Sequence, residues 1–415
     1  MISGKTQLIL KSRWLLVFVC LLAVVAALVV LAPSKLFIDS QWGGLRLFRD
    51  DQELGALFDM VGYFHRGQLP YQGTHLGYPP LAILYLTIPA LFTDNINVYG
   101  SLLIALNAIL TLALIAVTAY LLKEFGKKTN RLWLFTLPAF LYFAVNRFDV
   151  LPAFLSMLSL LFLVKKRFGW SFFLLSLLFL TKGYAIVLFP VWFVFYLNQQ
   201  PSQLSKENIF RPLFFFIIPI VVVTTFFCLV AGLENGLFPY VYQSLRYFGY
   251  GSFQVIFHQS LSSLLPAGIF NPGASLAVKA FSFLQLLLPI LIFAGYGVFK
   301  KYIKTADDVV RWSFLVLLIY VFLSIYYSPQ WLIWLLPFFV LTVSDWRAVR
   351  WWVAYDIFSY LQFPLAWDLL SPYSWGFEMA VLARTIILAV IIYKVGQRIW
   401  EVNFKHGPNT VSVGA

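Results

Sequence analysis

The sequence predicts an all-α fold with about 12 transmembrane helices. Hydrophobic residues make up 61% of the 415 positions, only 11% are charged, and the mean hydropathy is +0.83, which is too apolar for a soluble domain to keep its surface hydrated. A chain in lipid must be helical or a closed barrel, and the long runs of Leu, Phe, Val and Ile lack the alternation of barrel strands. Residues 1–415 are therefore predicted to form a single integral-membrane domain.

The predicted spans are apolar segments separated by polar turns and loops. A helix needs ~20 residues to cross a hydrocarbon core of ~30 Å, so the shorter segments must extend into their loops. Residues 14–32 form a longer apolar run than the ~7–15 residues of a signal-peptide core, which predicts an uncleaved first span. The remaining spans are expected at residues 98–122, 131–145, 149–164, 169–183, 184–197, 212–231, 276–299, 312–327, 331–343, 353–370 and 379–396.

Basic residues predict the orientation of these spans. If residues 79–92 do not cross the membrane, most of the 30 Lys and Arg residues fall in loops on one side, which the positive-inside rule assigns to the cytoplasm. Counting 79–92 as a span would place the basic cluster at 123–131 outside and break this pattern. Both termini, including a tail at 397–415, are therefore expected in the cytoplasm, and the net charge of +13 implies no nucleic-acid partner.

Two long loops, 33–97 and 232–275, then face the outside together with several short polar turns, and they are expected to contain interfacial or re-entrant helices. The first loop is rich in carboxylates, which are Asp39, Asp50, Asp51, Glu53, Asp59 and Asp94. No nucleotide sugar or ATP is supplied outside the membrane, so an enzyme working there must take an activated group from a lipid such as a polyprenyl-phosphate sugar. Such a transfer needs a base for the acceptor hydroxyl and cations for the departing phosphate.

Motifs along the chain indicate a family. The first loop contains Asp59-Met60-Val61-Gly62-Tyr63, then Gly67, Pro70-Tyr71 and Tyr78-Pro79-Pro80-Leu81. This stretch resembles the first loop of the C-type glycosyltransferase superfamily, closest to the glycosyltransferase family 87 mannosyltransferases. Further similar stretches follow in chain order at Arg147-Phe148-Asp149, Thr181-Lys182-Gly183-Tyr184, Arg246 with Ser252, and Ser328-Pro329-Gln330-Trp331. The similarity covers residues 35–340, with the departure that Gln243 stands where related proteins often have a histidine.

The resemblance implies the roles of individual residues. Asp59 is the expected catalytic base, and Asp50 and Asp51 are the fallback pair. The donor phosphate is expected to bind Lys182, Arg246 and Arg147, and further substrate contacts are expected at Tyr63, Tyr71, Tyr78, Asp149, Gln243 and Gln330.

The resemblance also implies the reaction. A hexose, expected to be mannose, moves from polyprenyl phosphate to a lipid- or glycan-linked hydroxyl, with inversion at the anomeric carbon. No cofactor and no metal ion are expected, because the departing phosphate needs neutralisation of its charge more than a proton. The expected location is a prokaryotic cytoplasmic membrane, with the site on the extracytoplasmic face.

Several of these residues also fit a purely structural role. Asp59 also fits one solvated acid among several, and Lys182 also fits a lysine that reaches toward the interface. Arg147 and Asp149 also fit an ion pair that steadies a tight turn. Arg384 lies inside the last predicted span, where it is expected to face a polar partner such as Asp368 or Glu378.

A secondary transporter or a lipid-carrier flippase is the alternative function. A dozen spans with both ends inside describe these classes as well. A transporter predicts two related halves and ionisable residues near the middle of spans. The chain contains no evident repeat, and most acids lie in or beside the outer loops.

Overall fold

A computed structural model describes residues 47–200, 204–242, 249–254, 256, 276–343, 345–370 and 374–402. Every regular element in these ranges is a helix, which confirms the predicted all-α class. The predicted first span at residues 14–32 lies outside them.

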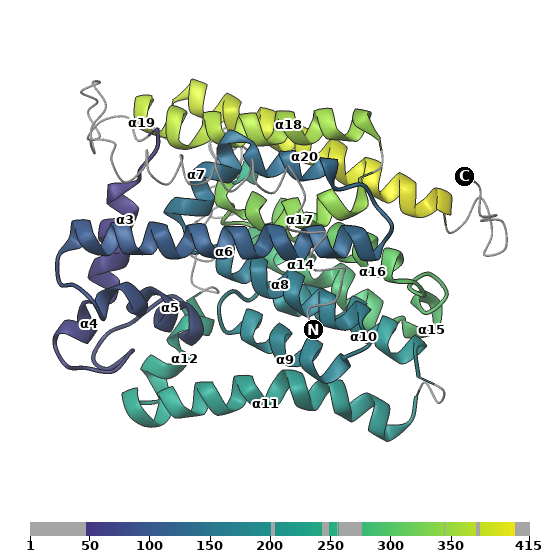
Figure 1. Cartoon of the computed structure of the whole chain (residues 1–415), viewed down its shortest axis with the longest axis horizontal. Coiled ribbons are helices and arrows are strands. Elements are labelled where there is room, and N and C mark those ends of the chain that lie inside the picture. The colour runs from purple at the N-terminus through teal and green to yellow at the C-terminus, as the bar shows by residue number, and fades with distance from the viewer. Residues whose placement is uncertain are drawn as a thin grey trace, which may run out of the picture.

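Three of the described helices are long and apolar enough to cross a membrane: α6 (Ile96–Glu124), α11 (Lys206–Ala231) and α20 (Trp375–Trp400). In Figure 1, α6 runs along the long axis near the middle of the molecule, α11 runs along one edge, and α20 lies toward the opposite edge. A fourth candidate span is the pair α7 (Pro138–Asn146) and α8 (Val150–Val164), which is bent by 103°.

The other helices are shorter. The medium-length helices are α5 (Pro80–Ala90), α9 (Phe168–Phe179), α10 (Ala185–Asn198), α14 (Leu276–Ala294), α16 (Ala306–Phe322), α17 (Leu332–Thr342) and α18 (Trp346–Tyr360). The remaining elements are α3 (Asp51–Met60), α4 (Gly62–His65), η1 (Thr129–Thr136), α12 (Leu233–Tyr242), α15 (Tyr296–Phe299), η3 (Pro329–Trp331), η4 (Leu361–Ala366) and α19 (Trp367–Leu369). The 11 residues of α5 measure about 17 Å, which is shorter than a hydrocarbon core of ~30 Å.

Proline breaks two segments that the hydropathy pattern predicts as single spans. In the segment 131–145, Leu137 is extended (φ −67°, ψ 147°), so the short 3-10 helix η1 ends there and α7 begins with Pro138 in its first turn. In the segment 353–370, Phe363 is extended (φ −145°, ψ 124°) before Pro364, and the helix is interrupted. The cause in both cases is steric, because a proline ring disfavours the helical conformation of the residue before it.

The polar turn predicted at 146–149 is confirmed as the bend between α7 and α8. A small core of apolar side chains holds the first loop against this bend. It includes Leu54 of α3, Tyr99 of α6 and Phe227 of α11, which cluster with Val145 and Phe148 on either side of the turn. Burying these side chains together positions the carboxylates at the start of α3 beside the turn.

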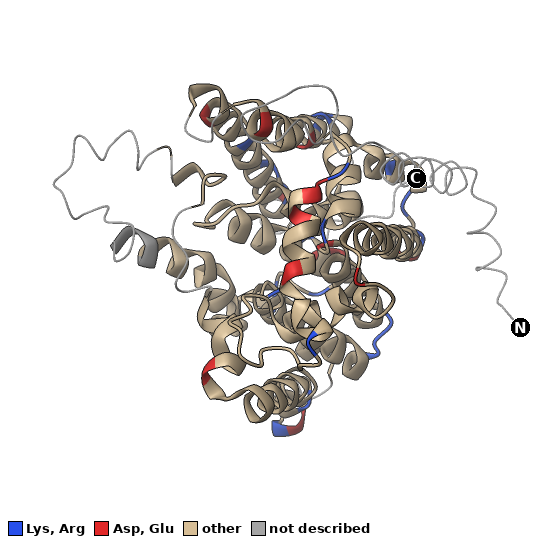
Figure 2. Ribbon diagram, turned by 90° about the vertical axis from the view of Figure 1, so that its left-hand side faces the viewer, with Lys and Arg blue, Asp and Glu red and all other residues tan. Residues whose placement is uncertain are grey.

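The elements of both predicted outer loops lie at the same end of the molecule. Helices α3, α4, α5 and α12 gather on the left of Figure 1, whereas α15 and the end of α20 lie on the right. Helix α20 continues to Trp400, four residues into the segment predicted as a tail at 397–415. Charged residues are sparse along the ribbon, as Figure 2 shows.

Candidate functional site

Five polar side chains from four separate stretches of sequence form one buried network at the bend between α7 and α8. The contacts run from Asp50 to Arg147, then to Gln330, Asp149 and Lys182. Asp50 precedes α3, Arg147 and Asp149 form the bend, Lys182 follows α9, and Gln330 lies in η3. All five belong to the predicted site, and the fold therefore brings together residues that are up to 280 positions apart in the sequence.

Arg147 is the centre of this network. Its Nη2 donates to Asp50 Oδ2 at 2.6 Å, and its Nε donates to Gln330 Oε1 at 2.9 Å. Glu53 Oε1 lies 3.8 Å from the same Nε, and the guanidinium carbon lies 5.4 Å from the centre of the Phe363 ring. Arg147 is 6% exposed and Asp50 is 1% exposed. This is a buried ion pair, so loss of either partner would leave an uncompensated charge in the interior.

Asp50 also organises the start of α3. Its Oδ1 accepts a hydrogen bond from Glu53 N at 3.2 Å, which caps the helix. Its backbone N donates to Asn146 Oδ1 at 2.9 Å, and Asn146 Nδ2 donates to Phe48 O at 2.7 Å. Oδ1 of Asp50 thus caps α3 and Oδ2 pairs with Arg147, whereas the backbone N of Asp50 and the side chain of Asn146 hold the first loop to the end of α7.

Asp149 is fully buried and accepts hydrogen bonds on both oxygens. Gln330 Nε2 donates to Oδ2 at 2.8 Å and Trp334 Nε1 donates to Oδ1 at 3.0 Å. Gln330 thus accepts from Arg147 and donates to Asp149, and this pair of contacts orients its amide. Gln330, which follows Pro329 in η3, thus bridges Arg147 and Asp149, the two charged residues of the bend.

Lys182 lies among three aromatic rings. Its Nζ is 4.7 Å from the centre of the Phe148 ring, 5.1 Å from that of Tyr78 and 5.6 Å from that of Trp334. The same Nζ is 3.4 Å from Asp149 Oδ1, a separation longer than a normal hydrogen bond, and the side chain is 15% exposed. The ring faces therefore add to the stabilisation of the ammonium group beside its carboxylate.

Among the residues that the structure describes, the network has no excess of positive charge. Arg147 is matched by Asp50, Lys182 is matched by Asp149, and Glu53 brings a third carboxylate close to Arg147. A bound phosphate would add further negative charge to this group. Binding one tightly therefore requires a cation beyond these pairs.

The two other candidate bases differ in their surroundings. Asp51 Oδ1 pairs with Arg49 Nε at 2.6 Å, whereas its Oδ2 is buried and accepts no hydrogen bond; the side chain is 36% exposed. Asp59 is exposed on the same side of α3 as Gln52 and Ala56. It lies nine residues beyond the N-cap, which is about 13 Å along the helix axis. The structure does not bring Asp59 to the network, and its role as base stays a prediction.

Two of the predicted tyrosines shape the first loop. The hydroxyl of Tyr63 hydrogen-bonds that of Thr87, and Tyr71 donates to Tyr78 O at 2.6 Å. Burial raises the pKa of both Tyr63 and Tyr71, so both stay protonated. Tyr71 also adopts a left-handed backbone conformation (φ 69°), which is uncommon for a bulky residue. A direct substrate contact at these two residues stays a prediction, while Tyr78 lies in the site beside Lys182.

Three residues that contact the network are absent from the set predicted from the sequence. Glu53 follows the N-cap of α3 by three positions, the spacing of a capping box, and Asn146 directly precedes Arg147. Trp334 follows Gln330 by four positions, which places it one helical turn later. These spacings are the signals that could have identified them.

Two other predicted site residues, Gln243 and Arg246, lie outside the described residues.

No protein-family model and no curated protein matches the chain. Within the described ranges, no group of three or more His, Cys, Asp or Glu residues lies together as a candidate metal site. The arrangement offers two partly exposed carboxylates at the start of α3, Asp51 and Glu53, near a network of fixed charges. Such groups can accept a proton and orient a charged substrate.

Proposed function

We propose that the protein is a membrane-embedded glycosyltransferase. It transfers a hexose, expected to be mannose, from a polyprenyl-phosphate donor to a hydroxyl of a lipid- or glycan-linked acceptor. One observation supports this proposal above the others: three stretches that resemble the motifs of one enzyme family, at Arg147–Asp149, Lys182 and Gln330, meet in a single buried network, and Tyr78 of the first-loop stretch lies against Lys182.

The proposed reaction is a direct displacement. The acceptor oxygen attacks the anomeric carbon while the bond from that carbon to the phosphate oxygen breaks, so the configuration inverts and polyprenyl phosphate leaves. The proton of the acceptor hydroxyl passes to a carboxylate. We assign this role to Asp51, because its Oδ2 accepts no hydrogen bond; this oxygen is buried, so the acceptor hydroxyl must enter beside α3 to reach it, while Oδ1 pairs with Arg49. Asp50 is less suited, since both of its oxygens are engaged.

Lys182 contributes to donor binding in this proposal. Gln330 and Trp334 already satisfy Asp149 at 2.8 and 3.0 Å, so Lys182 can turn from Asp149 toward a phosphate without leaving that carboxylate bare. Its side chain is 15% exposed and is the more accessible of the two cations in the network. Arg147 stays in place and orients Gln330.

The proposed location is a prokaryotic cytoplasmic membrane, with about 12 spans, both termini in the cytoplasm and the network on the extracytoplasmic side. The three long apolar helices and the shorter apolar ones support a membrane location. The bilayer, the lipid-linked donor and the acceptor are the proposed partners.

Transfer by the purified protein tests the proposal. The protein in neutral-lipid nanodiscs would receive radiolabelled polyprenyl-phosphate mannose and lipid acceptors extracted from prokaryotic membranes, and the release of polyprenyl phosphate would be measured. Asp51→Asn is expected to lower transfer about 10²–10⁴-fold, the usual contribution of a general base. Asp94→Asn is the matched control, because Asp94 is an exposed acid of the same loop.

Each outcome has a distinct meaning. If Asp59→Asn abolishes transfer and Asp51→Asn does not, the base is Asp59 and the proposed function stands. If the wild-type protein consumes no donor but moves a labelled solute or lipid carrier across a vesicle membrane, the protein is a transporter or a flippase and the proposed function is wrong.

A further inference from the structure

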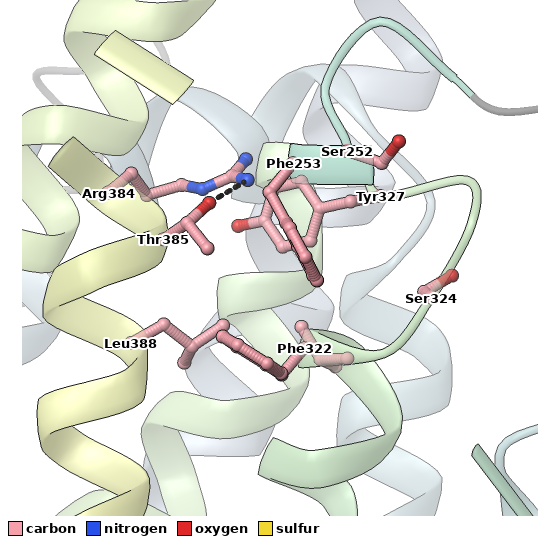
Figure 3. Close-up of a pocket in the computed structure, with 9 residues that line it drawn as sticks. Ser252, Phe253, Phe322, Ser324, Tyr327, Arg384, Thr385 and Leu388 are labelled. Atoms are coloured by element: carbon pink, nitrogen blue, oxygen red, sulfur yellow. Dashed lines mark hydrogen bonds between the residues drawn. The ribbon is translucent and has the colours of Figure 1, made fainter. Parts of the chain in front are cut away.

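Arg384 is a buried cation that the proposed reaction does not use. It is the tenth residue of α20, and only 2% of its surface is exposed. Figure 3 shows its guanidinium beside Thr385 and over the ring of Tyr327, with the rings of Phe253 and Phe322 nearby. These residues border a narrow pocket that has no room for a water molecule in its present form; the space of about 180 Å³ between its atoms includes open solvent.

All the hydrogen-bond partners of Arg384 are neutral. Nη1 donates to Gln362 Oε1 at 2.6 Å, and Nη2 donates to Gly251 O at 2.8 Å and to Thr385 Oγ1 at 3.1 Å. The guanidinium carbon lies 3.5 Å from the centre of the Tyr327 ring. The Nε atom is buried and has no hydrogen-bond partner.

The carboxylate partners expected for Arg384, Asp368 or Glu378, are not observed. Among the described residues, no acid lies within ion-pair distance of its guanidinium, in contrast to Arg147 and Lys182. An uncompensated charge in the interior costs several kcal/mol, and the neutral contacts offset only part of that cost. A buried guanidinium with a free N–H is a strong binding group for an anion.

The Arg384 pocket adjoins the network around Arg147. Gln362 contacts Arg384, and the next residue, Phe363, packs against Arg147. Tyr327, which lies under Arg384, leads through the rings of Trp331 and Trp334 to Lys182, with centre-to-centre distances of 5.9 and 4.8 Å between successive rings. The Arg384 pocket and the network are therefore linked through shared packing neighbours.

We propose that Arg384 binds the phosphate group of a lipid-linked substrate. This assignment rests on the proposed function, and it adds a cation to the described pairs of the network, whose charges balance. The planar guanidinium can engage two phosphate oxygens at once. Phe253, Phe322 and Leu388 give the pocket an apolar wall suited to the first carbons of a hydrocarbon chain. Because the pocket is narrow, binding requires the rings of Phe253 and Phe322 to move apart from their present 5.1 Å separation.

The carbonyl of residue 251 can approach Arg384 because this residue is a glycine, which has no side chain. A Cβ at this position would lie 2.6 Å from Tyr327 O and 3.0 Å from Gln362 Nε2, so any larger residue would push the segment away. The segment at 249–254 and the break after α18 are thus fitted together around the guanidinium.

Binding measurements separate this role from a purely structural one. The probes are polyprenyl phosphate, phosphatidylglycerol and inorganic phosphate, each added to the protein in neutral-lipid nanodiscs and followed by native mass spectrometry and thermal shift. Arg384→Gln is expected to weaken polyprenyl-phosphate binding at least about tenfold, and Arg384→Lys is expected to weaken it less. Lys394→Gln, which removes an exposed lysine from the same helix, should bind like the wild type.

Three results would overturn the assignment. Polyprenyl-phosphate binding by a folded Arg384→Gln variant within twofold of the wild type removes Arg384 from the site. If phosphatidylglycerol binds as tightly as polyprenyl phosphate, the Arg384 pocket is a general site for lipid headgroups. If inorganic phosphate binds as tightly as polyprenyl phosphate, the lipid chain has no part in binding. If Arg384→Gln does not fold, the Arg384→Lys variant decides, because unchanged affinity there excludes a guanidinium-specific contact. The two proposals can fail separately. If the wild-type protein binds polyprenyl phosphate through Arg384 but transfers no sugar, this assignment stands and the proposed glycosyltransferase function is wrong.

Discussion

Replacement of Asp50 by Asn should destabilise the protein by about 3 kcal/mol. The Asn side chain keeps the helix cap, because its Oδ1 can still accept from Glu53 N at 3.2 Å. It also places an amide N–H donor 2.6 Å from Arg147 Nη2, where a carboxylate oxygen accepts now. Breaking a buried ion pair costs ~3–5 kcal/mol. The lower end applies because Glu53, 3.8 Å from Arg147, compensates part of the charge.

Equilibrium unfolding in detergent would measure this loss, with Asp94→Asn as the control. Arg147→Gln should destabilise to a similar extent, because it leaves Asp50 buried without its cation. The double variant should lose less than the sum of the two single variants, since it removes both charges. A loss below about 1 kcal/mol in Asp50→Asn, or strict additivity in the double variant, would refute the buried pair as a stabilising contact of the site.

Three further predictions concern the same end of the molecule. Gln330→Glu should lower transfer at least about tenfold, because the new carboxylate would lie beside Asp149 and repel it; unchanged transfer would remove Gln330 from the site. Tyr71→Phe should lower the unfolding free energy by about 1 kcal/mol through loss of a buried hydrogen bond, measured against the wild type; a stability gain would contradict this. Asp59→Cys should react with a membrane-impermeant maleimide from the extracytoplasmic side while Lys123→Cys does not, and labelling of both from one side would contradict the predicted orientation.

The sequence could predict the polar turn and the charged residues around it. The stretch from Asn146 to Asp149 interrupts a strongly apolar region, and a lone lysine at 182 in another apolar stretch indicated a site. Both now belong to the buried network. The choice among the acids of the first loop could not be made in this way, because Asp50, Asp51 and Asp59 are chemically alike and differ only in what surrounds them.

Helix boundaries show a similar division. The apolar runs predicted helices, yet the runs at 131–145 and 353–370 contain a proline whose local steric effect divides them. A hydropathy value averaged over many residues does not detect the effect of a single proline. The break at Phe363 is also where the chain contacts two arginines, which no pattern of hydrophobicity could indicate.

By itself, the sequence determined that this chain is helical and apolar and that its carboxylates concentrate in an early loop, and it predicted a family from stretches that resemble that family's motifs. Only the tertiary structure decided that Asp50 pairs with Arg147, that Asp59 is exposed on α3, and that no acid of the described ranges pairs with Arg384. The physical reason is that composition and periodicity depend on neighbours along the chain. Ion pairs and desolvation depend on neighbours in space, which the packing of α3, α7, α17 and α20 brings together from distant positions.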